Sequence, residues 1–208
     1  RVKGAIAMVE AGAKTIIMDD GLQNPSLLKD LSLCVIDGTY GIGNGRVMPA
    51  GPLREEFEYS LQKSNAVVIL GLDQAGIAEQ IKRITPDMII IKAQIKAEPT
   101  DLDFTSQPVH AFAGIAQPEK FFITLNELGC TLAKTTAFTD HHAYTDAEVS
   151  ELIEAAQADK ALLLTTEKDY VRLDTKWQSA VKPLGIRLEW EDEAPLTALL
   201  EPIIRFAS

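Results

Sequence analysis

Residues 66–95, AVVILGLDQAGIAEQIKRITPDMIIIKAQI, carry the pattern from which the fold class follows. An apolar run, Ala66–Leu70, is followed by a segment of helical periodicity, Gln74–Arg83, and by a second, mainly apolar run, Met88–Ile95. Strands that are apolar at nearly every position are typical of parallel sheets, because helices cover both faces of such sheets. These residues therefore predict two parallel strands joined by a helix.

The same alternation extends over the whole chain. Further strands are predicted at Thr15–Met18, Leu33–Asp37, Val109–Ala113, Leu132–Phe138, Ala161–Thr166 and Leu184–Trp190. Further helices are predicted at Val2–Ala11, Arg54–Lys63, Pro118–Leu128, Asp146–Ala158 and Leu196–Phe206. Thr145 and Glu148 have the spacing of a capping box at the start of one of these helices. The pattern predicts an α/β protein with mostly parallel sheets.

A polar stretch that contains a proline, residues 97–103, separates the predicted strands into two sets. Such stretches are common between domains. We therefore predict a first domain over residues 1–98, a linker over 99–106 and a second α/β domain over 107–208.

The composition excludes several classes of protein. The 208 residues are 46% hydrophobic, which is too apolar for a disordered chain. No apolar run approaches the roughly 18 residues of a membrane-spanning helix. With 20 Lys and Arg against 30 Asp and Glu, the formal net charge of −10 argues against a nucleic-acid partner. Cys34 and Cys130 lie in apolar runs and are expected to be reduced, as in a cytosolic protein.

The first candidate site follows the predicted strand Thr15–Met18. Asp19 and Asp20 come at its end, and Gly21 lets the chain turn sharply. In open α/β sheets, ligands collect at the carboxyl ends of the strands, where a carboxylate can bind Mg²⁺ beside a nucleotide phosphate. From the residues alone, the alternative is a solvated turn in which the Asp side chains cap backbone amides.

A second candidate is the glycine-rich segment of residues 38–55, which follows a predicted strand. Dinucleotide binding is excluded, because residues 47–52 contain prolines and cannot open the helix that must receive the pyrophosphate. Long ordered loops are usually functional. Arg46 and Arg54 have the bidentate geometry that suits phosphate, although isolated arginines more often form surface ion pairs.

Two further candidates end predicted strands of the second set. Asp140, His141 and His142 place a carboxylate and two imidazoles before a capped helix. This arrangement suits a general base or a metal site, and equally a loop histidine bonded to backbone. Lys168 is a candidate phosphate ligand, but from the residues alone we favour a short helix that Thr166 caps.

Taken together and in this order, these segments resemble the tetraacyldisaccharide 4′-kinase family, the lipid A 4′-kinases of Gram-negative bacteria. The resemblance covers nearly all of the chain. The matching segments are Asp19–Gln23, Val35–Asp37, Gly43–Arg46, Pro49–Glu55, Phe112–Ile115 with Pro118 and Phe121–Phe122, Asp140–His141, and Thr166–Asp169.

The resemblance implies transfer of the γ-phosphoryl group of ATP, with Mg²⁺, to the 4′-hydroxyl of a tetraacylated lipid A disaccharide 1-phosphate, which gives lipid IVA in lipid A biosynthesis. It implies the remainder of a P-loop kinase domain followed by a smaller C-terminal α/β domain. It also implies a peripheral protein at the cytoplasmic face of the bacterial inner membrane, with this chain itself soluble.

The resemblance also assigns roles to individual residues. Asp19 and Asp20 resemble the acids that serve Mg²⁺, and Glu55 resembles a further acidic member of the active site. His141 resembles the histidine that activates the sugar hydroxyl, and we prefer it to His142. The expected substrate-binding residues are Gln23, Asn44, Arg46, Arg54 and Lys168.

One departure from the family concerns ATP. The sequence contains no G-x-x-x-x-G-K-[ST] phosphate loop, which family members carry upstream of the segment that matches Asp19–Gln23. We therefore expect a fragment that by itself binds ATP poorly and transfers no phosphate. In addition, Asn24 stands where many members carry a histidine, so no proton-transfer role is assigned there.

Two other functions are compatible with the residues. A metal-dependent phosphoesterase would use Asp140, His141 and His142, with acids nearer the N-terminus as further ligands. A non-catalytic lipid-binding module would keep the lipid-recognition half of the family and lack its nucleotide half.

Overall fold

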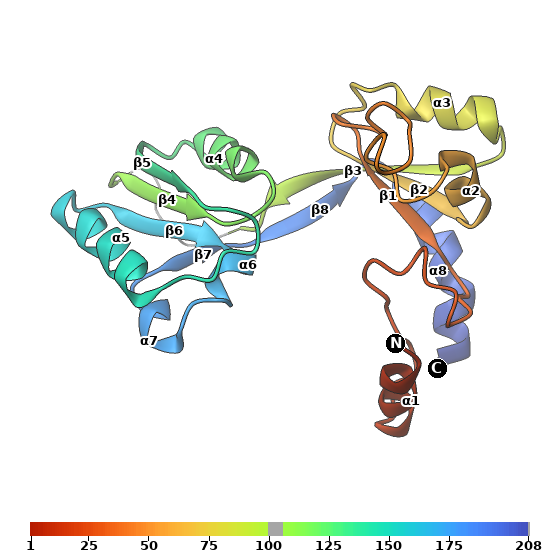
Figure 1. The fold of residues 1–208 in the computed structure, drawn as a ribbon, viewed down its shortest axis with the longest axis horizontal. Coiled ribbons are helices and arrows are strands. Elements are labelled where there is room, and N and C mark those ends of the chain that lie inside the picture. The colour runs from red at the N-terminus through yellow and green to blue at the C-terminus, as the bar shows by residue number, and fades with distance from the viewer. Residues whose placement is uncertain (100–105, 208) are drawn as a thin grey trace. The chain divides into compact units, whose positions relative to one another are not determined.

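The structure, a computed structural model, describes residues 1–99 and 106–207. The chain forms two compact units (Figure 1). Unit 1 contains Arg1–Ile95 and Leu188–Ser208, and unit 2 contains Lys96–Arg187. Each unit has its own four-stranded sheet and its own core.

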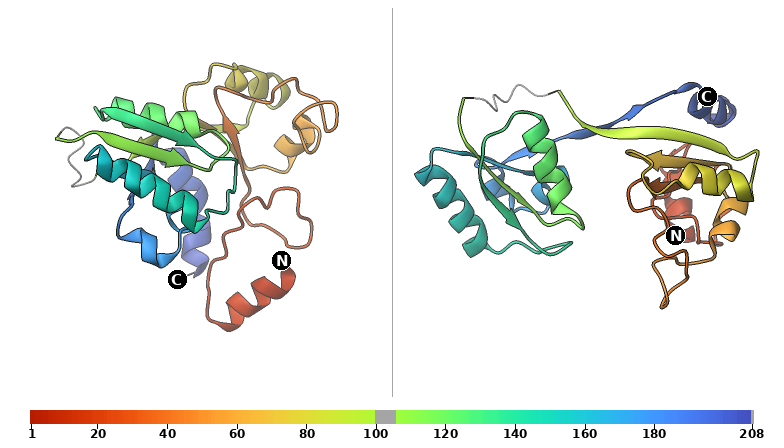
Figure 2. Two further views of the ribbon diagram at one scale, coloured as in Figure 1. Left: turned by 60° about the vertical axis from the view of Figure 1, so that its left-hand side comes forward. Right: turned by 90° about the horizontal axis from the view of Figure 1, so that it is seen from above.

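The sheet of unit 1 has the strand order β1-β2-β3-β8. Its strands are β1 (Leu33–Asp37), β2 (Ala66–Leu70), β3 (Ile89–Ala97) and β8 (Ile186–Trp190). The first three run parallel, with β1 paired to β2 and β2 to β3. Figure 2 shows β8 beside β3, and backbone bonds from Glu98 to Gly185 and from Glu191 to Lys92 make this pair antiparallel.

Helices cover both faces of the unit 1 sheet. They are α2 (Phe57–Gln62), α3 (Ile77–Ile84) and α8 (Ala194–Ala207), whereas α1 (Val2–Glu10) has no buried residue and belongs to neither core cluster. Val67 and Ile69 of β2 share a core cluster with α2 and α3, whereas Ala66 and Val68 belong to a cluster that α8 covers. Successive residues of a strand point to opposite faces, so β2 is apolar at every position because both faces are buried.

The sheet of unit 2 is parallel throughout and has the order β5-β4-β6-β7. Its strands are β4 (Val109–Ala113), β5 (Leu132–Ala137), β6 (Leu162–Thr166) and β7 (Lys182–Leu184). Its helices are α4 (Pro118–Glu127), α5 (Asp146–Ala158), α6 (Glu167–Tyr170) and α7 (Thr175–Gln178). Figure 1 shows α4 and α5 on opposite faces of this sheet, α4 packing with Ala111 and α5 with Phe112 of the central strand.

The predicted α/β class with mostly parallel sheets is confirmed. Thr145 forms the predicted capping box with Glu148 at the start of α5, and Thr166 caps the predicted short helix α6. Cys34 and Cys130 are both free thiols. Asp73 accepts hydrogen bonds from the first amides of α3, so this helix begins later than its periodicity predicts.

Two predicted strands are wrong. Thr15–Met18 forms no strand, and Ile17 is exposed. None of the described strands pairs with this segment, and a strand without a partner leaves its backbone groups without ladder bonds. The predicted strand Leu184–Trp190 divides at Gly185 into β7 and β8, which belong to different sheets.

The two units differ from the predicted domains, 1–98 and 107–208, in where they place the C-terminal residues. Residues 188–208 belong to unit 1, because β8 pairs with β3 and α8 covers the apolar face that includes Val68 and Ile91. Most of the predicted linker, 99–106, lies outside the described residues. Across residues 1–99 and 106–207, none of the helices combines the length and apolar character that a bilayer crossing requires.

Deleting residues 188–208 is expected to destabilise unit 1 and to leave unit 2 intact. The deletion removes most of β8, one of the two strands beside β3, and exposes the face of β2 that contains Ala66 and Val68. Hydrogen exchange followed by mass spectrometry should show faster exchange in β2 and β3 and unchanged exchange in β4 and β6. Equal loss of protection in both sheets would contradict this assignment.

Candidate functional site

The buried carboxylate of Asp169 joins the ends of two strands in unit 2. It has no solvent exposure. Its Oδ2 accepts hydrogen bonds from the backbone N–H of Gly114, after β4, at 3.0 Å and from the hydroxyl of Thr166, at the end of β6, at 2.7 Å. Its Oδ1 accepts one from Nη1 of Arg172 at 3.3 Å. A buried charge is tolerated only with such partners, so this carboxylate fixes the local geometry.

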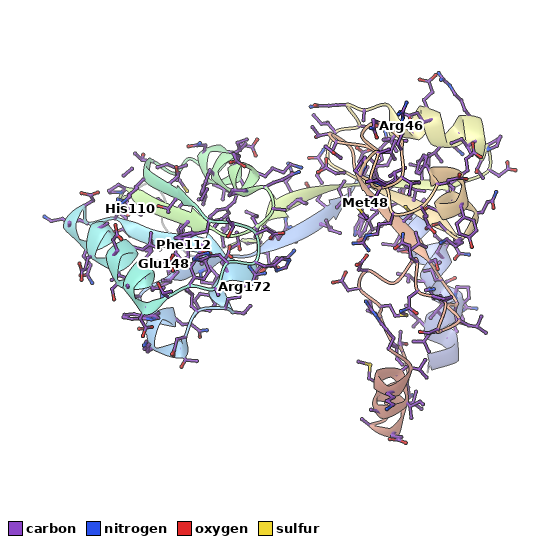
Figure 3. All side chains as sticks on the ribbon, viewed as in Figure 1. Arg46, Met48, His110, Phe112, Glu148 and Arg172 are labelled. Carbon is purple, nitrogen blue, oxygen red and sulfur yellow. The ribbon has the colours of Figure 1, made fainter. Side chains whose placement is uncertain are left out.

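Arg172 connects this buried network to the exposed loop of residues 138–145. Its Nη1 also donates to the carbonyl oxygen of Gly114 at 3.2 Å, and its Nη2 lies 2.9 Å from Nδ1 of His141. Figure 3 shows Arg172 at the opposite end of the unit 2 sheet from His110. The guanidinium therefore links the interior of unit 2 to the predicted catalytic histidine.

His141 is held in place by its backbone while its ring stays accessible. Its φ is +59°, and its N–H donates to the carbonyl oxygen of Gly114 at 3.1 Å and to Oδ1 of Asp140 at 3.0 Å. The side chain is 79% exposed, and its Nε2 lies 3.7 Å from Oδ2 of Asp140. An uncommon backbone conformation that several bonds enforce is typical of functional sites.

The ring of His142 is partly buried and in contact with two other side chains. Its ring stacks on Phe138 with centroids 4.6 Å apart, and its Nε2 lies 3.1 Å from Oε1 of Glu148. Hydrogen bonds from the backbone and hydroxyl of Thr145, then from His142, lower the pKa of Glu148 to about 2. Since Nε2 of His142 faces Glu148 and Nδ1 of His141 faces Arg172, the two imidazoles do not converge on one metal position.

Gly114 is required by close packing. A Cβ at this position would lie 2.8 Å from the hydroxyl oxygen of Tyr144 and 3.2 Å from Oδ1 of Asp169. Within the described residues that hydroxyl is buried without a hydrogen bond of acceptable geometry, and burial together with the nearby Asp169 carboxylate raises the pKa of Tyr144. Only a residue without a side chain lets β4 end against these groups.

In unit 1, Asp20 and Arg54 join two segments predicted to share a site. Nη1 of Arg54 lies 2.6 Å and 2.8 Å from the two carboxylate oxygens of Asp20. This bond and the positive charge lower the pKa of Asp20. Both side chains are more than half exposed, so the pair orients the segments more than it stabilises the fold.

Glu55 joins the same two segments. Its Oε1 accepts hydrogen bonds from Nε2 of Gln23 at 3.2 Å and from the hydroxyl of Ser60 at 2.8 Å, and its Oε2 accepts one from Nζ of Lys63. Burial by itself raises the pKa of Glu55, but the bonds from Lys63, Ser60 and Gln23 outweigh burial and leave it lowered. Glu55 is therefore a charged carboxylate that positions Gln23.

The loop of residues 38–55 is ordered by its own side chains. The amide of Asn44 donates to the carbonyl oxygen of Ala50 at 2.8 Å and accepts the backbone N–H of Arg46 at 3.1 Å. A Cβ on Gly51 would lie 2.1 Å from this amide oxygen. The side chain of Arg46 is exposed and makes no ion pair within the described residues (Figure 3).

The unit 1 residues border a pocket of about 220 Å³. It is lined by Leu22–Gln23, by Cys34–Asp37 and by Pro52–Glu55, among others. In residues 1–99 and 106–207, no group of three or more His, Cys, Asp or Glu side chains is gathered as a metal site. Mg²⁺ that is bound together with phosphates takes only one or two protein carboxylates, and the side chain of Asp19 is exposed.

The predicted site residues thus lie in two units. Asp19, Asp20, Gln23, Asn44, Arg46, Arg54 and Glu55 are in unit 1, whereas His141 and Lys168 are in unit 2. The roles of Gly114, Tyr144 and Arg172 were not found from the sequence. The sequence does contain one indication of the role of Arg172. It lies three residues after Asp169, just beyond a strand predicted to be buried, so the two side chains could form an ion pair.

Comparison with known proteins identifies the family. The family profile described as "Tetraacyldisaccharide-1-P 4'-kinase", LpxK, matches residues 1–205. Proteins named tetraacyldisaccharide 4′-kinase from Paramagnetospirillum magneticum and Rhodospirillum centenum are 44% and 42% identical to this chain. Both alignments cover 98% of this chain but 62% and 60% of the relatives, so the chain spans about three fifths of their length.

A solved structure shows the same fold. It is the crystal structure of the "apo" form of LpxK from Aquifex aeolicus in complex with ATP, with a TM-score of 0.69 and 23% sequence identity. The match covers 96% of this chain and 61% of that one.

Substituting Gly114→Ala is expected to lower the free energy of unfolding of unit 2 by about 1–3 kcal/mol, because the new methyl group overpacks the site. Tyr144→Phe removes the nearest atom that this methyl group would meet. The double variant should therefore lose less stability than the sum of the single variants, as measured by urea denaturation. Strict additivity would show that the Tyr144 hydroxyl does not limit the space at Gly114.

Unit 2 is expected to lose stability as the pH falls from about 4.5, the ordinary pKa of Glu148, toward the folded value of about 2. A pKa that is lowered in the folded state stabilises the fold above the unfolded value, and protonation removes that contribution. Glu148→Gln should flatten this part of the stability profile, measured by urea denaturation across the pH series. Glu154→Gln, an exposed change on the same helix, is the control, and identical profiles for both variants would contradict the prediction.

Proposed function

The chain belongs to the tetraacyldisaccharide-1-P 4′-kinase family, and we propose on this basis that it is the larger part of an enzyme that phosphorylates a lipid A precursor. The reaction is transfer of the γ-phosphoryl group of ATP to the 4′-hydroxyl of tetraacyldisaccharide 1-phosphate, giving lipid IVA. The chain spans about three fifths of its relatives, so the activity belongs to the whole protein.

The exposed, rigidly held imidazole of His141 is the observation that carries the proposal. Phosphoryl transfer requires little covalent chemistry from the protein and depends on positioning and charge. His141 has a constrained backbone, a second residue bound to its Nδ1, and a ring that is 79% exposed. These features suit a side chain that engages the acceptor hydroxyl as its proton leaves.

The unit 1 residues suit the phosphate side of the reaction. We assign Asp19 and Asp20 to Mg²⁺, which would offset the negative charge of the phosphates. Asp19 can bind directly, whereas Asp20 must release Arg54 or act through water, since the guanidinium contacts both of its oxygens. Glu55 supports this region by holding Gln23, which is assigned to substrate.

Cationic side chains suit the anionic groups of the substrates. Arg54 is oriented by its ion pair with Asp20. Arg46 lies in a loop that hydrogen bonds of Asn44 hold in place. Both guanidinium groups can therefore bind a phosphate. Lys168 is exposed in α6 of unit 2. We assign these residues to the substrate phosphates, with Asn44 acting through the loop that it orders.

The location of the reaction follows from the substrate. A disaccharide with four acyl chains resides in a bilayer, so the enzyme must meet it at a membrane surface. We place the whole protein peripherally at the cytoplasmic face of the inner membrane, where ATP is present. The net charge of −10 on this chain does not favour binding to anionic lipid by charge.

The proposal is tested with the complete protein, ATP, Mg²⁺ and tetraacyldisaccharide 1-phosphate. His141→Ala is expected to lower kcat by about 10²- to 10⁴-fold while thermal stability is unchanged, because the side chain is exposed. His142→Ala should instead lower thermal stability, since it removes the stacking on Phe138 and the bond to Glu148.

Mass spectrometry of the product locates the new phosphate. Absence of phosphorylation at the 4′ position by the complete protein would overturn the proposed function. A larger loss of kcat for His142→Ala than for His141→Ala would show that the reactive histidine is the other one.

A further inference from the structure

The carboxylate of Glu55 is the centre of a small hydrogen-bond network in unit 1, and its side chain is only 16% exposed. Its Oε1 accepts from Nε2 of Gln23 at 3.2 Å and from the hydroxyl of Ser60 at 2.8 Å, and its Oε2 accepts from Nζ of Lys63. Lys63 is the C-cap residue of α2, and its Nζ lies 4.3 Å from the ring centroid of Tyr59. The ring and the carboxylate together fix this cation in place.

The network determines which end of the Gln23 amide faces Glu55. An ionised carboxylate accepts hydrogen bonds and has no hydrogen to donate, so the amide meets it through the NH2 group and its carbonyl oxygen points elsewhere. Gln23 is exposed and lines the unit 1 pocket together with Arg54. The carbonyl oxygen of Gln23 is therefore left as a hydrogen-bond acceptor at this pocket.

The charge of Lys63 preserves this orientation. Burial by itself raises the pKa of Glu55, and the hydrogen bonds from Lys63, Ser60 and Gln23 outweigh burial and lower it. Without the lysine, a carboxyl group as buried as Glu55 takes up a proton more readily. A protonated carboxyl group can donate to a carbonyl oxygen, so the Gln23 amide could then turn over and present its NH2 group to the pocket.

We propose that Lys63 is a positioning residue that acts through Glu55 and holds the carbonyl oxygen of Gln23 toward the substrate, where it accepts a hydrogen bond from a sugar hydroxyl. This inference rests on the proposed function and assigns a chemical class to the group that Gln23 binds. A phosphate that is ionised near neutral pH offers mainly acceptors, which a carbonyl oxygen cannot bind. The guanidinium of Arg54 suits the phosphate instead.

A reciprocal swap of the side chains at positions 23 and 55 tests this orientation in the complete protein with ATP, Mg²⁺ and tetraacyldisaccharide 1-phosphate. Gln23→Glu alone opposes two carboxylates, and we expect KM for the lipid to rise about 10²-fold. Adding Glu55→Gln restores an N–H donor between the two positions, and the carbonyl oxygen of the new amide can still accept from Lys63. The acceptor toward the substrate is kept, so the double variant should return KM to within about tenfold of wild type.

The swap also distinguishes a sugar hydroxyl from a phosphate. If Gln23 donated to a phosphate, the carboxylate at position 23 would repel that phosphate in the single and the double variant alike. A double variant that recovers none of the affinity lost by Gln23→Glu would therefore overturn the proposal.

The role of Lys63 is tested by removing its charge. Lys63→Met should raise KM for the lipid by about 10²-fold with a smaller effect on kcat, and Lys63→Arg, which keeps the charge, should retain most of the affinity that Lys63→Met loses. The control is Arg83→Met, which breaks an exposed ion pair with Glu79 in the same unit. Equal KM values for Lys63→Met and Arg83→Met would overturn the role assigned to Lys63.

The pH dependence of the Lys63→Met variant separates positioning from a general loss of structure. Without the cation, burial raises the pKa of Glu55, so KM should be highest at low pH and should fall toward wild type as the pH rises and Glu55 ionises. The other titratable group that acts on Glu55 in the described residues is Cys34 of β1, and burial raises the pKa of its thiol and keeps it neutral. A KM raised by the same factor at every pH would contradict the proposal.

A readout without turnover uses ¹H–¹⁵N NMR of the complete protein with ¹⁵N-labelled glutamine side chains. The NH2 signal of Gln23, identified by its loss in Gln23→Leu, should show one proton shifted downfield by the bond to Glu55, and Lys63→Met should remove this shift. The same spectrum in both proteins would overturn the positioning role.

The two proposals fail in different ways. The expected NMR difference in a complete protein without 4′-kinase activity would overturn the proposed function and leave the orientation of Gln23 by Lys63 standing. Should Lys63→Met fail to fold, the swap at positions 23 and 55 still decides the question.

Discussion

A carboxylate without solvent exposure must find its donors inside the protein, and Asp169 finds them at the ends of β4 and β6 and on Arg172. This requirement determines much of the unit 2 site. It draws Gly114 against the start of α6, places Arg172 beside the 138–145 loop, and through Arg172 holds the ring of His141. Because such a charge is costly to leave unpaired, the arrangement is rigid before any substrate arrives.

In unit 1 the main constraint is that both faces of the sheet are buried. Every residue of β2 is needed by one core cluster or the other, so the sheet requires helices on both sides. The chain supplies the second layer only after passing through unit 2, when β8 pairs with β3 and α8 covers the open face. The segments around Asp20 and Glu55 are joined by an exposed ion pair and a partly buried carboxylate. An exposed pair holds its segments less firmly than the buried carboxylate of Asp169 holds the ends of β4 and β6.

Several features of the fold and site were predictable from residue patterns. Apolar runs identified β2 and β4, and Thr145 with Glu148 identified the start of α5, because both signals arise from neighbours in the chain. Thr15–Met18 has the same apolar signal but forms no strand, since pairing depends on a partner distant in sequence. For the same reason the segment Leu184–Trp190 gave no sign that it divides at Gly185 between two sheets.

The sequence by itself determined the fold class, the family resemblance and the residues with reactive side chains, including His141, Asp19 and Asp20. These follow from periodicity, from local capping and from the order of short motifs. Only the tertiary structure decided that His142 is braced by Phe138 and Glu148 while His141 stays accessible, and that Arg172 occupies Nδ1 of His141. The Arg172 contact joins residues 31 positions apart, whereas the His142 contacts are only four and six residues away. In both cases the direction of the side chain is set by packing and hydrogen bonding in three dimensions, which residue patterns do not give.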